Sequence, residues 1–222
     1  MRVGGAGNEM RAAALEAGVN EFSISSTPIR FQAHTTGPQG QDLTTFVVAG
    51  GCFWCLDAVY QRTRGVASVI SGYTGGADPA PTYRSVCGGG TGHAEAVAVT
   101  FDPAVVPGEV ILDMFFTTHD PTTLNRQGYD VGTQYRSALF PLDAAQEVEF
   151  AAAVRKFAEL YPDPIVTVFE SPADFFVAEG IHQDYYNRFP DEGYCRVIID
   201  PKLAKARKYY ATWLEEPATP RS

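Results

Sequence analysis

Residues 45–62 constrain the fold most, because an apolar run there meets two glycines and then a helical stretch. Residues 45–49 (TFVVA) are apolar or β-branched, which is typical of a buried strand. Gly50 and Gly51 permit a sharp turn, since a residue without Cβ adopts backbone conformations that are closed to others. The residues after Cys52 fit a helix. We therefore expect the folded body to open with a strand, a tight turn and a helix.

The rest of the chain adds strands and helices in a recognisable order. Side chains at 95–101 alternate with the period of a strand, and Asp143 is a good N-cap for a long helix. The expected elements are strands at 45–49, 67–73, 95–101, 136–140 and 165–169, and helices at 53–62, 107–116, 144–160 and 203–214. The first six elements follow the order β-α-β-β-α-β, which is the split βαβ or ferredoxin-like arrangement. The predicted fold class is therefore α+β, with a two-layer core.

One folded domain is expected over residues 44–215, because no internal repeat and no linker interrupts this stretch. Residues 1–43 lack periodicity and contain the breaker run TTGPQGQ at 35–41, which predicts an irregular N-terminal extension. An extended C-terminal segment should close the domain, and residues 216–222 should form a tail.

The charge and the apolar segments exclude some classes of function. The formal net charge is −9, which disfavours binding to nucleic-acid phosphates. No stretch approaches the roughly 20 apolar residues of a membrane-spanning helix, and the N-terminus lacks the features of a secretory signal. We expect a cytoplasmic monomer without nucleic-acid or membrane partners. In that compartment its 4 cysteines should be reduced and available for chemistry.

Cys52 falls at the predicted start of the first helix. A thiol there faces free backbone N–H groups and the positive end of the helix dipole, and both favour the reactive thiolate. Phe53 and Trp54 suggest a pocket for a small apolar group. Cysteine can also be a small core residue at such a position. Cys55 completes a Cys-x-x-Cys pair that is also typical of thioredoxin-like proteins. No second pair supplies further zinc ligands, so we expect no metal.

Several segments in one order resemble the peptide methionine sulfoxide reductase A family over about residues 44–200. The matching segments are Gly51–Trp54 (GCFW), Ser71–Gly76 (SGYTGG), Pro81–Tyr83 (PTY), Thr91–Glu95 (TGHAE), His119–Pro121 (HDP) and Gln127–Ser137 (QGYDVGTQYRS). The resemblance makes 44–215 a catalytic domain. It implies reduction of methionine S-sulfoxide, free and in oxidised proteins, as a repair reaction after oxidative damage.

The implied chemistry assigns roles to residues that lie far apart in the sequence. Cys52 would attack the sulfoxide sulfur as a thiolate. The departing oxygen needs a proton, and Glu95 would supply it, with its pKa raised by desolvation in an aromatic pocket. Tyr83 and Tyr135 would hydrogen-bond the sulfoxide oxygen as neutral phenols. Asp130 would orient this polar side of the pocket.

The resemblance also assigns the apolar side of the pocket. Phe53 and Trp54 would receive the S-methyl group through sulfur–aromatic contact. The stretch 182–185 (HQDY) also matches the family and is expected to be scaffold or pocket rim. No bound cofactor is expected.

A second thiol is needed after the attack, which leaves Cys52 as a sulfenic acid. The resemblance implies a resolving cysteine and then reduction of the disulfide by thioredoxin. Cys195 is favoured, because many family members keep this cysteine in a similar late glycine-containing segment. Cys55 is the alternative, since its spacing permits a disulfide with Cys52. Cys87 is expected to be a bystander. The tail lacks another cysteine, which favours a single resolving event.

Two other functions remain open from the residues alone. A thiol–disulfide oxidoreductase could use Cys52 and Cys55, but no suitable run for a cis-proline loop precedes a strand. A non-catalytic acidic module could bind peptides in the aromatic pocket. Such a module would need neither Glu95 nor a thiol at the helix start, so turnover with a dithiol reductant separates it from an enzyme.

Overall fold

The computed structural model of the chain describes residues 27–171 and 174–215. Most of the predicted extension and the whole predicted tail at 216–222 lie outside the described residues. Within the described part of the extension, residues 34–36 form a strand. The strand predicted at 45–49 begins earlier, at Asp42.

A seven-stranded sheet forms the centre of the structure. Its strands follow the order β8-β7-β2-β4-β3-β9, with β1 beside the start of β2. The bounds are β1 His34–Thr36, β2 Asp42–Gly50, β3 Val66–Thr74, β4 Ala94–Phe101, β7 Ser137–Phe140, β8 Val168–Phe169 and β9 Phe176–Val177. Neighbouring strands are antiparallel, except that β7 and β8 are parallel. β5 Arg126–Gln127 and β6 Asp130–Val131 form a separate hairpin.

Both faces of the sheet are covered, which explains why β2 reads as a continuous apolar run rather than an alternating one. Phe46 and Val48 of β2 belong to the large core cluster beneath the helices. Val47 and Ala49 point to the opposite face, where they pack in a smaller cluster with Phe140 and other residues. All four side chains are buried.

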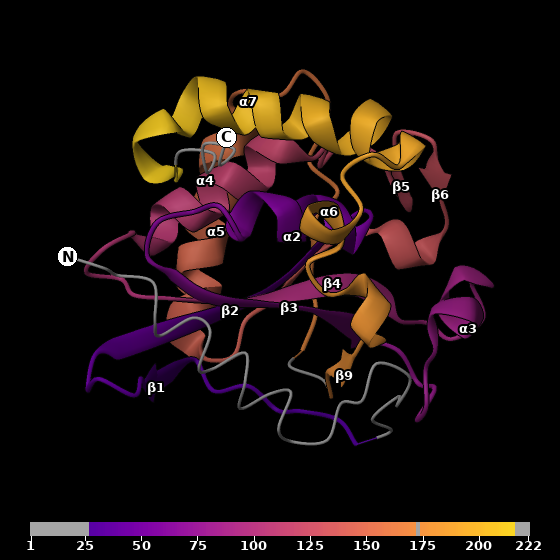
Figure 1. Cartoon of the computed structure of the whole chain (residues 1–222), viewed down its shortest axis with the longest axis horizontal. Helices are drawn as coiled ribbons and strands as arrows, with labels where there is room; N and C mark the ends of the chain where they lie inside the picture. The colour runs from indigo at the N-terminus through magenta and orange to yellow at the C-terminus, as the bar shows by residue number, and fades with distance from the viewer. Residues whose placement is uncertain (1–26, 172–173, 216–222) are drawn as a thin grey trace, which may run out of the picture.

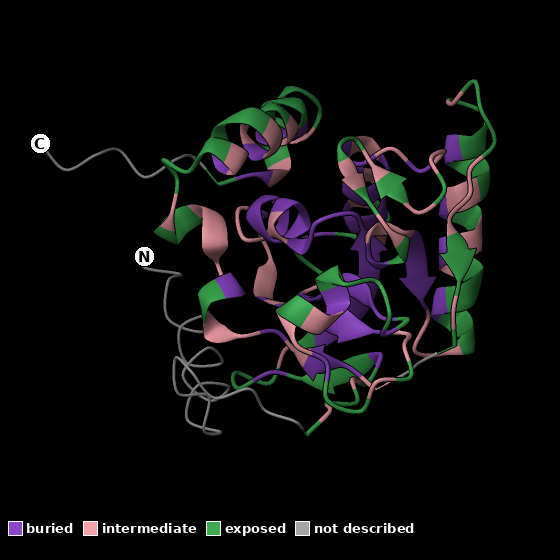
Figure 2. Ribbon diagram, turned by 90° about the vertical axis from the view of Figure 1, so that its right-hand side faces the viewer, coloured by how far each residue is buried: buried purple, intermediate pink, exposed green. Residues whose placement is uncertain are grey.

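The helices lie mainly on one face of the sheet. They are α2 Phe53–Tyr60, α3 Tyr83–Cys87, α4 Gly108–Thr118, α5 Ala144–Ala158, α6 Tyr185–Arg188 and α7 Asp200–Tyr210. Short helical turns at Thr133–Tyr135, Gly180–His182 and Ala211–Trp213, and a π-helical turn at Cys195–Ile199, complete the described elements. Figure 1 shows α2 between the sheet and α7. Figure 2 shows burial concentrated in the central strands and the helix on them.

The element order agrees with most of the sequence-based expectations. β2, α2, β3, β4, α4 and β7 follow the predicted order, and α5 occupies most of its predicted range. Two predictions were wrong in extent. Only residues 168–169 of the strand predicted at 165–169 are in the sheet, because the backbone N–H of Val166 donates to the carbonyl of Pro121 instead. The last helix begins at Asp200 because it continues the π-helical turn before it.

None of the helices in the described ranges is both long and apolar enough to cross a membrane.

Candidate active site

Gly51 makes the turn that places Cys52 at the start of α2. Its φ is +90°, and a Cβ there would lie 2.5 Å from the Gln127 side chain. Only glycine therefore fits this position without strain. Cys52 is the N-cap residue of α2 and is 6% exposed. The predicted strand, tight turn and helix are thus confirmed around Cys52.

Glu95 reaches the same point from the neighbouring strand β4. Side chains alternate between the two faces along a strand, so Glu95 shares the helix-facing side of β4 with Val97 and Val99. Its Oε2 accepts a hydrogen bond of 3.1 Å from the backbone N–H of Phe53, at the first turn of α2. Oε1 has no hydrogen-bond partner in the described structure. The carboxyl group is therefore anchored by one oxygen and has a free one.

Burial decides the protonation state of Glu95, which is 1% exposed. Desolvation raises its pKa from 4.5 to about 8, against the opposing effect of the Phe53 N–H. Asp130 raises it further through its negative charge. The rise predicted from the sequence is confirmed. At pH 7 the carboxyl group is mostly protonated and can donate a proton.

Two phenols lie on the other side of the site. Tyr83 begins α3, and its backbone N–H donates to Glu179 Oε1 at 2.8 Å. Tyr135 ends the helical turn that follows β6. Burial raises the pKa of both tyrosines, and the charges of Cys52 and Glu95 contribute to both shifts. The structure thus brings Cys52, Glu95, Tyr83 and Tyr135 together and keeps both phenols as neutral donors.

Aromatic rings form the apolar wall of the site. Trp54 is half-buried and stacks on Tyr185, with ring centroids 3.8 Å apart and planes 7° apart. It also stacks on Tyr83 at 6.1 Å. Phe53 is fully buried and its ring lies 5.6 Å from that of His182. Tyr185 and His182, from the stretch expected to be scaffold or pocket rim, therefore pack against Trp54 and Phe53.

Tyr194 is a site residue that the sequence reasoning did not assign. Its hydroxyl donates to Asp130 Oδ2 at 2.7 Å, and its ring meets Trp54 edge-on at 5.5 Å. The same hydroxyl interacts with the Cys52 and Cys55 sulfurs. In the sequence, only the neighbouring Cys195 indicated that this segment packs near α2.

The pKa values of the two thiols of the Cys-x-x-Cys pair shift in opposite directions. Burial raises the pKa of the Cys52 thiol well above 9.0, and the interactions with Cys55 and Glu95 add to the rise. The Cys52 thiol is the main cause that lowers the pKa of Cys55 to about 6, and the charge of Lys202 contributes to the same shift. Burial opposes it. In the substrate-free site burial thus opposes the thiolate that the helix start favours at Cys52, and the role expected of this thiolate stays a prediction.

The other two cysteines differ in burial and in their neighbours. Cys195 is fully buried at the start of the π-helical turn, in the core cluster that also contains Cys52 and Cys55. Cys87 ends α3 and is exposed. Its thiol interacts with the hydroxyls of Tyr83 and Tyr135. The structure thus places Cys195 on the α2 side, and Cys87 beside the phenols.

No group of three or more His, Cys, Asp or Glu side chains within residues 27–171 and 174–215 could hold a metal ion.

The sequence and the fold both match known proteins. The family model described as peptide methionine sulfoxide reductase matches residues 44–214. A peptide methionine sulfoxide reductase MsrA of Pseudarthrobacter chlorophenolicus is 63% identical over 172 residues, covering 78% of this chain and 99% of that protein. A protein of the same name from Deinococcus radiodurans is 53% identical over 182 residues, covering 81% of this chain and 88% of that protein.

Solved structures give the same result. Reduced Mxr1 from Saccharomyces cerevisiae has a TM-score of 0.65 at 33% identity, over 73% of this chain and 93% of that one. Methionine sulfoxide reductase A of Corynebacterium diphtheriae has a TM-score of 0.64 at 32% identity, over 74% of this chain and 84% of that one. The family match thus covers the strand, the turn, the acid and the phenols of the site. The chain belongs to the peptide methionine sulfoxide reductase family of oxidoreductases.

Proposed function

We propose that this protein reduces methionine S-sulfoxide, free and in oxidised proteins, with Cys52 as the nucleophile. One observation carries the proposal: the buried Cys52 thiol starts α2, and the buried Glu95 carboxyl group accepts a hydrogen bond from the backbone N–H of the next residue, Phe53. The sulfoxide sulfur needs a nucleophile while its oxygen needs a proton, and this pair supplies both. Trp54 and Phe53 supply the apolar wall for the S-methyl group.

Glu95 acts as the general acid. It donates its proton to the sulfoxide oxygen as the sulfur–oxygen bond breaks, and its high pKa keeps that proton available at pH 7. Tyr83 and Tyr135 donate hydrogen bonds to the same oxygen and stabilise the charge that develops there. Asp130, held by the Tyr194 hydroxyl, fixes the polar side of the pocket and helps keep Glu95 protonated through its negative charge.

Cys55 assists the attack and then resolves its product. Its sulfur is positioned against the Cys52 thiol and can accept the thiol proton as Cys52 attacks, so the raised pKa of Cys52 is compatible with its role. The product is a sulfenic acid on Cys52. Cys55 lies next to that sulfur, which favours it as the first resolving thiol over Cys195. Cys195 is buried in the same core cluster and is the second candidate.

A dithiol of the thioredoxin class then reduces the disulfide, and no bound cofactor takes part. The catalytic domain spans residues 44–215. The antiparallel order β7-β2-β4-β3, with α2 and α4 as the connections between strands, supports assigning its core to the ferredoxin-like class.

Epimer-pure substrates test the proposal. Wild type and Cys52→Ser are assayed with a dithiol reductant on peptides that carry either the S- or the R-sulfoxide of methionine. Wild type should reduce the S-epimer, and Cys52→Ser should be inactive on both. Full activity of Cys52→Ser, or equal rates of wild type on the two epimers, would overturn the proposal.

A further inference from the structure

Glu179 joins two distant parts of the chain beside the phenols. It lies directly before the helical turn Gly180–His182, and its side chain is 21% exposed. Its Oε1 accepts a hydrogen bond of 2.8 Å from the backbone N–H of Tyr83. Its Oε2 accepts another of 2.8 Å from the hydroxyl of Tyr73. One carboxyl group therefore ties the start of α3 to strand β3.

The segment that carries Glu179 is itself fixed to the sheet. β9 pairs with β3, and the backbone N–H of Ala178 donates to the carbonyl of Ser71 at 2.9 Å. The side chain of Gln183 makes hydrogen bonds of 2.9 Å to both backbone groups of Ser71. Hydrogen bonds to β3 thus lie on both sides of Glu179 in the sequence, so its side chain reaches out from a fixed backbone.

α3 needs such an anchor because it is short and little buried. Of its five residues only Val86 is buried, and a helix of this length is not stable by itself in water. The backbone N–H groups of a first helical turn have no partners within the helix. Thr82 accepts the N–H of Ser85, and Glu179 accepts that of Tyr83. The position of Tyr83 therefore depends on a side chain from a distant segment.

The same segment also holds the ring of Tyr83. The ring of His182 lies 4.3 Å from it between centroids, and the backbone N–H of His182 donates to the Glu179 carbonyl at 2.8 Å. Ring contacts of this kind tolerate a range of offsets. The hydrogen bond between Glu179 and the Tyr83 backbone therefore fixes how far the phenol reaches into the site.

We propose that Glu179 is a positioning residue for sulfoxide reduction: by holding the backbone N–H of Tyr83, it sets where the Tyr83 hydroxyl meets the sulfoxide oxygen. The inference rests on the proposed function, because it needs a sulfoxide oxygen beside the phenols. Glu179 acts through Tyr83 and takes no part in bond making or proton transfer. What it supplies is a side chain long enough to bind Tyr83 and Tyr73 together.

Three substitutions separate the length of this side chain from its charge. Glu179→Gln keeps the length: its carbonyl oxygen can accept the Tyr83 N–H, and its amide group can donate to the Tyr73 hydroxyl, which accepts as well as donates. Glu179→Asp keeps a carboxyl group but is one methylene shorter, so it cannot keep both hydrogen bonds. Glu179→Ala removes both.

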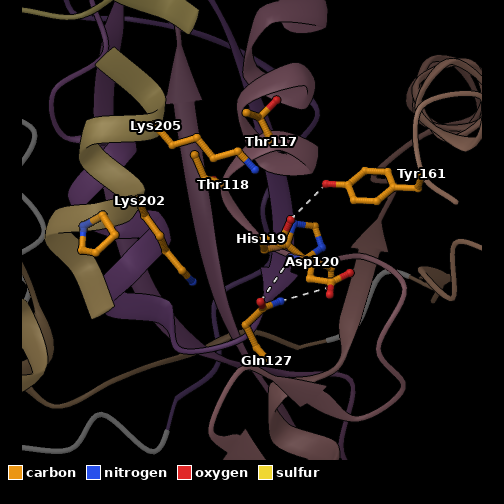
Figure 3. Close-up of a pocket in the computed structure, with 9 residues that line it drawn as sticks. Thr117, Thr118, His119, Asp120, Gln127, Tyr161, Lys202 and Lys205 are labelled. Carbon is orange, nitrogen blue, oxygen red and sulfur yellow. Dashed lines mark hydrogen bonds between the residues drawn. The ribbon is translucent and has the colours of Figure 1, made fainter. Parts of the chain in front are cut away.

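Gln127→Ala is the matched control, beside the turn before Cys52. The Gln127 side chain lies against Gly51 and makes two hydrogen bonds of 3.1 Å with the backbone of Asp120. Figure 3 shows Gln127 and Asp120 on the wall of a cavity of about 390 Å³. The control therefore loses as many hydrogen bonds as Glu179→Ala, but none of them holds α3.

Two measurements on the full chain test the inference. Hydrogen exchange of the Tyr83 amide, followed by NMR in the native state, reports on the anchor without any sulfoxide chemistry. Single-turnover formation of methionine at pH 7, with a saturating S-sulfoxide peptide, reports on the chemical step. Each substitution is also combined with Tyr83→Phe, and separately with Tyr135→Phe, so that coupling to each phenol is measured.

Glu179→Asp and Glu179→Ala should speed exchange at Tyr83 on the order of tenfold or more. They should slow methionine formation between about tenfold and the roughly 100-fold expected for Tyr83→Phe. In the Tyr83→Phe background they should add little, because the hydroxyl that they displace is already absent, whereas with Tyr135→Phe they should still slow the reaction. Glu179→Gln should stay close to wild type in both measurements. Gln127→Ala should leave exchange at Tyr83 unchanged, and any loss of rate should persist in the Tyr83→Phe background.

Three results would overturn the inference. The first is a wild-type rate in Glu179→Asp despite faster exchange at Tyr83. The second is a loss of rate that is as large in the Tyr83→Phe background as in wild type, and the third is a Glu179→Gln variant as slow as Glu179→Ala. If Glu179→Ala does not fold, the Asp and Gln variants decide the question. In each case the proposed function stands, because it fails only on the behaviour of wild type and of Cys52→Ser.

Discussion

Replacing Glu95 by glutamine should stop the chemistry and at the same time stabilise the protein. The glutamine keeps the shape of the side chain and its carbonyl oxygen can still accept the Phe53 N–H. It carries no acidic proton, so the sulfoxide oxygen loses its general acid. Such acids typically contribute 10²–10⁴-fold to a rate. We expect a loss of this order in the rate of methionine formation, with little change in substrate binding.

The gain in stability follows from the pKa of Glu95. Folding raises it from 4.5 to about 8, so the folded state holds a proton that the unfolded state has released. The resulting stabilisation is fully present below pH 4.5 and is lost as the pH rises toward 8. At about 1.4 kcal/mol per unit, the loss in wild type is about 3 kcal/mol at pH 7 and roughly 5 kcal/mol above pH 8. Glu95→Gln escapes this loss.

Urea unfolding of wild type and Glu95→Gln at pH 5, 7 and 8.5 measures the difference. The free energy of unfolding of the variant should gain on that of wild type by about 1.4 kcal/mol per pH unit between pH 5 and pH 8. Glu109→Gln is the control, because Lys156 lowers the pKa of this exposed glutamate and its loss cannot produce such a gain. A difference between Glu95→Gln and wild type that does not change with pH would refute the reasoning.

Two further predictions concern the turn and the phenols. Gly51→Ala should lower the free energy of unfolding by about 2–4 kcal/mol, because φ is +90° and the new Cβ meets Gln127. Gly40→Ala, at φ +80° with nothing within 4 Å, should lower the free energy of unfolding less in the same denaturation experiment. Equal losses in the two variants would show that the contact with Gln127 is not what excludes a side chain at Gly51. In rapid-quench assays, methionine formation should be slowed on the order of 100-fold by Tyr83→Phe and likewise by Tyr135→Phe. An unchanged rate in either variant would show that its hydroxyl does not bind the sulfoxide oxygen.

Local sequence signals predicted the part of the site that local structure builds. The apolar run before Gly50 and the helix after Cys52 form a unit whose conformation depends on nearby residues. The alternation along 95–101 likewise predicted a strand, and its parity places Glu95 on the helix side. These features were accessible because strand and helix periods are written in consecutive residues.

Other elements depended on pairing between distant segments. β1 and β9 have 3 and 2 residues, too few for a period to appear, and exist because they lie beside β2 and β3. α3 was missed, although Thr82 and Ser85 form a capping box that marks its start.

The electrostatics of the thiols required the structure as well. The sequence argument used the helix start at Cys52, which favours a thiolate. It did not include the extent of burial or the charges of Cys55 and Glu95, which raise the pKa of Cys52 in the substrate-free site. The motif thus pointed to a candidate nucleophile, and its surroundings in the structure show what shifts the pKa values of the two thiols.

The most direct test of the central claim is the burst of methionine from protein without reductant. Wild type and the variants Cys52→Ser, Cys55→Ser, Cys87→Ser and Cys195→Ser are each mixed with an S-sulfoxide peptide and quenched after one turnover. Every protein that retains Cys52 should release about one methionine per chain or more, and Cys52→Ser should release none. A full burst of methionine from Cys52→Ser would contradict the account. So would a burst that disappears only when one of the other cysteines is replaced.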